Sequence, residues 1–146
     1  MIPTTRAALN ALRLGLLISF VGWVISFYFA VAPWAAAAAQ LEGMGLGYLE
    51  YRPLLDYWLR MAATAFGCIG IASALACAYP DMFKGMILLL GPFHYLMGIV
   101  LTLAARENHL DRDLHPTFGP DILFCFLTGT LITLPLVLAW KAQRNV

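Results

Sequence analysis

Four long, nearly uncharged runs follow one another along the chain, each ended by charged or turn-forming residues. A helix of twenty residues is about 30 Å long, which matches the hydrocarbon core of a bilayer. The runs therefore predict membrane-spanning helices rather than the half-apolar elements of a water-soluble domain. We place these helices at residues 14–36, 58–79, 86–105 and 121–140.

The segments between the runs predict how the helices connect. The alanines at 35–39 are expected to continue the first helix beyond the membrane, until the glycines within 43–47 break it. Only residues 80–85 separate the second run from the third, which predicts a tight antiparallel hairpin. The predicted fold is a single all-α domain over residues 1–146. It is an integral membrane four-helix bundle of up-down-up-down topology, with both termini on the same side.

Composition supports lipid as the main solvent of the chain. Hydrophobic residues make up 62% of the sequence and charged residues 12%, about half the usual share of charge. The formal net charge of +1, without a basic stripe, argues against a nucleic-acid partner. The three cysteines lie in apolar runs and form no CxxC pair, so neither a zinc site nor a disulfide framework is indicated. We expect no cofactor.

Basic residues predict the orientation. With four crossings, the side that carries the termini has five basic residues and the other side has four. Counting basic residues alone, the positive-inside rule places the termini in the cytoplasm. The five are Arg6, Arg13, Lys84, Lys141 and Arg144.

Small residues recur at spacings of three and four on the first three predicted helices, for example at Gly67 and Gly70. In lipid, small residues allow helix backbones to approach closely, and this packing drives helix association. The pattern predicts the contact faces of a left-handed bundle, and a homo-oligomer interface is the alternative interpretation.

His94 is the one side chain in the run 86–105 that titrates near neutral pH. It lies between Gly91 and Gly98 on the small-residue face and near the middle of the membrane, so we expect it to point into the bundle. One interpretation is a neutral imidazole hydrogen-bonded to a hydroxyl group. The other is a functional role in proton relay, ligand contact or ligation of a metal or haem. The hydroxyls at a similar depth, and thus the other candidate ligand-binding residues, are those of Ser73, Thr130 and Thr133.

Two further candidate sites lie outside the membrane core. An extended strand over residues 109–115 would point two imidazoles and two carboxylates the same way, as a divalent transition metal could use, although such loops are usually just solvated. The four predicted metal ligands are His109, Asp111, Asp113 and His115.

The second of these sites is a cluster at the rim of the bundle mouth, for which capping and interhelical pairing are the alternative explanation. An ion pair between Asp56 and Arg60, four residues apart, is also expected. The predicted rim residues are Tyr57, Arg60, Arg106 and Asp121.

Short motifs between residues 57 and 129 resemble segments of small four-helix bacterial membrane proteins of the BphX-like and, more distantly, the DoxX-like groups. The motifs include YWLRM at 57–61, AFG at 65–67 and FGPD at 118–121. The resemblance implies a four-helix bundle in the bacterial inner membrane and adds no catalytic residue.

The sequence shows no signature of an enzymatic nucleophile or a cofactor site. The leading functional hypothesis is a structural or accessory subunit that packs in a homo-oligomer or beside a larger membrane complex. The second hypothesis is a carrier or binding protein for a small hydrophobic ligand or lipid, with a pocket beside His94. A membrane redox enzyme is the third.

Overall fold

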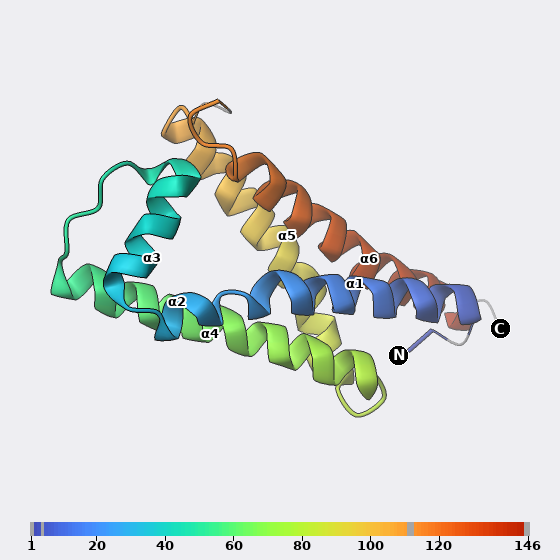
Figure 1. Ribbon diagram of the computed structural model, residues 1–146. Coiled ribbons are helices and arrows are strands. Elements are labelled where there is room, and N and C mark those ends of the chain that lie inside the picture. Colours follow the sequence, from blue (N-terminus) through green and yellow to red (C-terminus); the bar gives the residue numbers. More distant parts are fainter. Residues whose placement is uncertain (1, 4, 111–112, 145–146) are drawn as a thin grey trace.

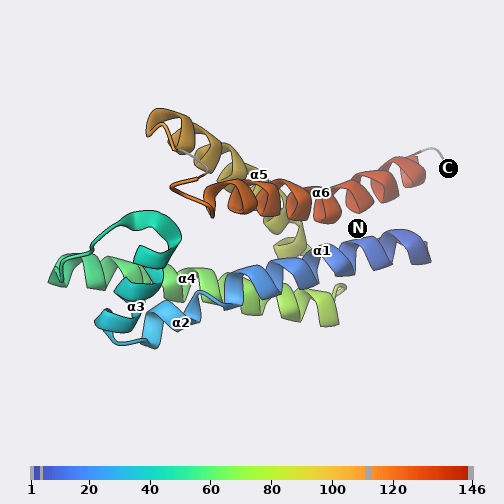
Figure 2. The same ribbon diagram turned by 45° about the horizontal axis from the view of Figure 1, so that its top comes forward.

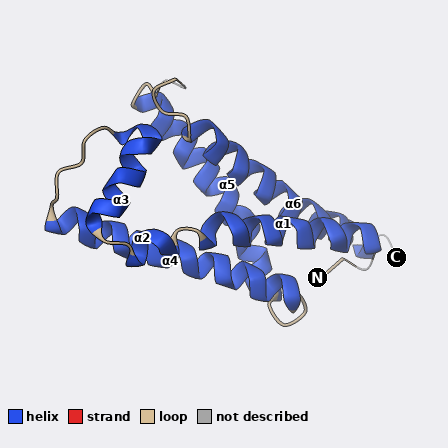
Figure 3. Cartoon of the chain, viewed as in Figure 1, coloured by secondary structure: helices blue, strands red, loops and turns tan. Residues whose placement is uncertain are grey.

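The computed structural model describes residues 2–3, 5–110 and 113–144, and these residues contain helices, turns and loops but no strand. Figures 1 and 3 show the helices and the loops that connect them. The helices in chain order are α1 (Arg6–Val24), α2 (Phe27–Val31), α3 (Trp34–Leu41), the π-helical turn η1 (Glu42–Leu46), α4 (Pro53–Ala78), α5 (Lys84–Glu107) and α6 (Phe118–Arg144).

Four helical segments of the described chain are long and apolar enough to cross a membrane, which confirms the predicted number. Each is longer than its uncharged run, because the helix continues through charged residues in its terminal turns. The four segments are Arg6–Val31, which comprises α1 and α2, and then α4, α5 and α6.

The alanines at 35–39 do not continue the first helix, so that expectation is wrong. Pro33 has no backbone N–H and disfavours a helical conformation in the residue before it. Ala32 accordingly adopts an extended conformation, with φ −63° and ψ 143°. The alanines form the separate helix α3, which leaves α2 at an elbow (Figure 1).

Glycines set the contact between α4 and the first segment. A Cβ atom added at Gly67 would lie 2.6 Å from the ring of Phe27, and one added at Gly70 would lie 2.6 Å from the backbone nitrogen of Val24. Both glycines therefore touch another helix, as predicted. Along α4 from Gly67 to Gly70, the contacted residue moves backward along the first segment, from Phe27 to Val24. The two segments therefore run in opposite directions.

α6 lies between α1 and α5 and runs antiparallel to both. Gly15 of α1 packs on Ile132, and Gly22, further along α1, packs on Phe124. α5 packs on α6 in the same antiparallel manner, and the contacting pairs are Gly91–Thr133 and Gly98–Phe126. The helices are thus arranged in the order α4, α1, α6, α5.

α4 and α5 contact each other much less than the other neighbouring helices do. They are joined by the short turn after Ala78, and Figures 1 and 2 show them diverging away from that turn. The apolar core accordingly lies toward the end of the bundle that holds the turn and the chain termini. Its buried members are Leu12, Leu16, Ala76, Ile87, Leu90, Ile132 and Leu136.

Arg60 holds the elbow between α2 and α3 from its position on α4. Its guanidinium donates to the carbonyls of Ala30 and Ala32 at 3.0 and 3.2 Å, and these carbonyls lie at the end of α2. Its Nε lies 3.0 Å from a carboxylate oxygen of Asp56, which confirms the predicted ion pair. The guanidinium thus satisfies carbonyls that have no donor within their own helix.

The arm formed by α3 and η1 reaches the connection between α5 and α6. Gly45, with φ 97°, lies directly against the carbonyl of Leu114. A Cβ atom at this position would meet that carbonyl and would have to adopt a left-handed conformation. The glycines within 43–47 therefore end the separate arm of α3 and η1, rather than the first helix as predicted, and they also allow the arm to dock.

Candidate functional site

His94 is fully buried at the centre of the helix assembly, one turn after Gly91 on α5. The small residue Gly129 of α6 lies against its Cβ atom. The small residues of the two helices thus leave room for an imidazole between them. The expectation that His94 points into the bundle is confirmed.

Both ring nitrogens of His94 are engaged in hydrogen bonds. The indole Nε1 of Trp23 donates to Nε2 at 2.9 Å, and Nδ1 lies 2.7 Å from the carbonyl oxygen of Leu90. Since an indole N–H can only donate, Nε2 must be the acceptor and Nδ1 must carry the proton. His94 is therefore a neutral imidazole held in one tautomer, and neither nitrogen is open to a further ligand.

Aromatic rings enclose this hydrogen bond. Trp23 stacks on Phe66 with ring centroids 4.8 Å apart, and it also contacts Phe93 and Phe124. Phe124 contacts the imidazole as well. The rings come from α1, α4, α5 and α6, so every membrane-spanning segment contributes to one layer around His94. Such packing excludes water, which makes the enclosed polar atoms dependent on each other.

The predicted partners of His94 lie elsewhere. Ser73 bonds Ser19 across the α1–α4 contact, with 2.8 Å between the hydroxyl oxygens. Thr130 bonds the hydroxyl of Tyr95, also at 2.8 Å. The expectation of a hydroxyl partner for His94 is wrong, because the longer indole of Trp23 spans the gap from α1.

A depth count could have found Trp23. His94 lies ten residues after Lys84, and Trp23 lies ten residues after Arg13. Both basic residues belong to the side of the termini, so the two side chains reach the same depth. An indole N–H beside Gly22 on a small-residue face was therefore a candidate donor.

Two threonine hydroxyls in the bundle have no hydrogen-bond partner in the described structure. They belong to Thr128 and Thr133 of α6, and each oxygen is buried. The hydroxyl of Thr133 lies against Gly91. Thr133 is therefore at the α5–α6 contact, beside the helix turn that holds His94 but not bonded to it.

The predicted rim cluster is divided in two. Tyr57 is exposed on α4, and Arg60 is bound to Asp56 and to the end of α2. Arg106 lies on the other side, in a groove at the α5–α6 connection, and Asp121 lies in the first turn of α6. No ion pair among the described residues joins Arg60 to Asp121, because α4 has diverged from α5 and α6 at this end.

The predicted metal site lies partly outside the described residues, since these omit Asp111. His109 has φ 50°, in the left-handed region, and residues 113–114 form a turn. The extended strand assumed for this loop is therefore wrong where the structure describes it. No group of three or more potential metal ligands occurs among the described residues, and a site that includes Asp111 stays a prediction.

No protein-family model matches the chain, and neither a curated protein nor a solved structure shows a significant match to it.

Proposed function

We propose that this chain is a non-catalytic, multi-pass protein of the bacterial inner membrane that serves as a structural or accessory subunit. In this proposal the termini face the cytoplasm, and the protein packs in a homo-oligomer or beside a larger membrane complex. Membership of the BphX-like group is part of the same proposal. The observation that carries the proposal is the sealed hydrogen bond between Trp23 and His94.

A general base or a metal ligand must present a lone pair to its substrate or ion. In His94 the lone pair of Nε2 is taken by Trp23, and the proton on Nδ1 is directed at the carbonyl of Leu90. His94, the side chain within the membrane that is most suited to acid–base or ligand chemistry, is thus used to join α5 to α1. This favours a structural role for His94 over a redox, relay or carrier role.

An exposed face of α4 supports association with another helix. α4 packs on α1 and α2, but it contacts α5 only slightly. Ala65 and Cys68 are exposed on its outer side, with the half-buried Ala72 one turn further on. Small side chains at these spacings permit a close helix–helix approach, which is the main driving force for association in lipid.

Cysteine cross-linking in native membranes tests the homo-oligomer. Cys68 is exposed, whereas Cys125 is buried and Cys77 is half-buried. A Cys77→Ala/Cys125→Ala variant would retain one thiol on the proposed contact face. Oxidation with copper phenanthroline should then produce a disulfide-linked dimer.

A matched control moves the thiol to the exposed face of α5. Leu96 is 61% exposed and lies at a similar depth, so the control is Leu96→Cys in a chain whose own cysteines are all alanine. Cross-linking at Cys68 alone would support a specific α4 interface. A second subunit type bound at fixed stoichiometry in native mass spectrometry would support the larger complex. Equal cross-linking at both positions, or none together with a monomer that has no partner, would overturn the proposal.

A further inference from the structure

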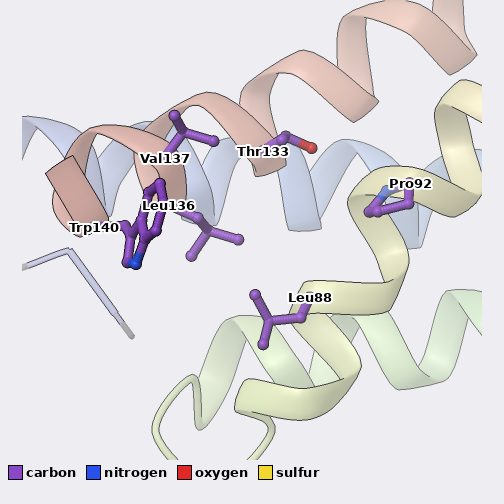
Figure 4. Close-up of a pocket in the computed structure, with 6 residues that line it drawn as sticks. All are labelled: Leu88, Pro92, Thr133, Leu136, Val137 and Trp140. Atoms are coloured by element: carbon purple, nitrogen blue, oxygen red, sulfur yellow. The ribbon is translucent and has the colours of Figure 1, made fainter.

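A groove runs between α5 and α6 on the side of the bundle that carries the termini. Its volume is about 490 Å³, within the range of about 300–1,000 Å³ that is usual for ligand sites. Figure 4 shows the side chains of the two helices facing each other across it. The lining residues are Leu88, Pro92, Thr133, Leu136, Val137 and Trp140.

The extent and the lining of the groove suit one apolar chain. It begins where Gly91 and Thr133 bring the helices together, and it ends at Trp140 near the end of α6. The distance along α6 from Thr133 to Trp140 is about 10 Å at 1.5 Å per residue. Apart from Thr133 at its inner end, its walls are mostly hydrocarbon, which favours an apolar occupant.

The end of the groove at the membrane surface is basic. Arg144 lies one turn beyond Trp140, and its guanidinium is 4.6 Å from the centre of the indole ring. Lys84 lies one turn before Leu88, at the start of α5, and pairs with Asp81 at 3.1 Å. Asp81 is the one acid at this end among the described residues, and Arg6, Arg13 and Lys141 add further positive charge.

We propose that the groove binds an anionic phospholipid, with one acyl chain between α5 and α6 and the phosphate at Lys84, Lys141 and Arg144. The acyl chain would be complementary to the apolar walls of the groove, and the phosphate would be complementary to the basic residues at its mouth. The opposite end of the bundle has an excess of acids, so the same lipid would be repelled there. This inference does not depend on the proposed subunit role.

The test compares retention of phosphatidylglycerol and phosphatidylcholine by the full-length, delipidated protein in native mass spectrometry. Each basic residue near the surface contributes about fivefold to anionic-lipid binding. The double variant Lys141→Gln/Arg144→Gln should therefore lose about 25-fold in affinity for phosphatidylglycerol and keep its affinity for phosphatidylcholine. Arg52→Gln removes an exposed charge at the opposite end and should change neither.

A second variant fills the groove itself. Val137→Trp should reduce the retention of phosphatidylglycerol at least tenfold, because the indole occupies the space of the acyl chain. Val100→Trp, at an exposed position of α5 outside the groove lining, is the matched control and should bind normally. Size-exclusion profiles identical to that of the parent protein establish that each variant is folded.

Two results would overturn the proposal. The first is equal retention of the two lipids by the parent protein. The second is unchanged phosphatidylglycerol binding in the folded groove variant Val137→Trp. Either result leaves the α4 cross-linking experiment unaffected, so failure here is distinguishable from failure of the subunit role.

Discussion

The hydrogen bond between Trp23 and His94 should contribute measurably to the stability of the bundle. Its atoms lie 2.9 Å apart, and the imidazole is 0% exposed, so neither group can turn to water when the other is removed. Trp23→Phe keeps most of the aromatic packing but leaves Nε2 without a donor. His94→Leu leaves the indole N–H without an acceptor.

Each of these single substitutions should lower the free energy of unfolding by about 1–3 kcal/mol, the usual cost of an unsatisfied buried polar group. His94→Gln should cost less, because its amide supplies both an acceptor for Trp23 and a donor for Leu90. In the double variant Trp23→Phe/His94→Leu both polar groups of this hydrogen bond are removed, so neither is left unpaired. The coupling energy should therefore be about 0.6 kcal/mol and at most about 1.7 kcal/mol, which are the average and the maximum for hydrogen bonds between helices within a membrane.

Reversible unfolding in mixed micelles, by titration with sodium dodecyl sulfate, provides the four free energies of the cycle. Trp140→Phe combined with His94→Leu is the control cycle, since Trp140 lies at the end of α6 and should be additive with His94. Nitrogen NMR of the imidazole should also show Nε2 without a proton. A coupling energy no larger than that of the control cycle, or a proton found on Nε2, would refute the reasoning.

Two further predictions concern backbone contacts. Gly70→Ala should destabilise the protein by about 1–3 kcal/mol in the same assay, because the new methyl group meets the backbone of Val24 rather than a movable side chain. Gly85→Ala has open space around it in the first turn of α5 and should be neutral or slightly stabilising, so equal effects of the two substitutions would contradict this account. Arg60→Gln should release the elbow between α2 and α3, which hydrogen exchange would report as faster exchange confined to residues 30–46, and unchanged exchange there would exclude the assigned role.

The hydropathy pattern was sufficient to predict the membrane as solvent and the four spans, and the spacing of small residues was sufficient to predict the contact role of Gly67 and Gly70. These properties depend on one helix at a time, since length and apolar content decide whether a segment can cross a bilayer. The inward direction of His94 belongs to the same class, because the glycines of its own helix mark the packed face. The Asp56–Arg60 pair is local to one helix turn and was also predictable.

The elbow at Pro33 has a local cause that the sequence already carries, whereas the partner of His94 and the division of the rim residues were decided only by the tertiary structure. Trp23 meets His94 because α1 packs on α6 at a particular rotation and register, and these depend on side chains about 70–120 residues away in sequence. When only depth in the membrane was counted from the sequence, several hydroxyls were equivalent candidates for the partner of His94. Three-dimensional packing distinguished them by reach, since the indole spans a gap that the hydroxyls of Ser73 and Thr130 do not.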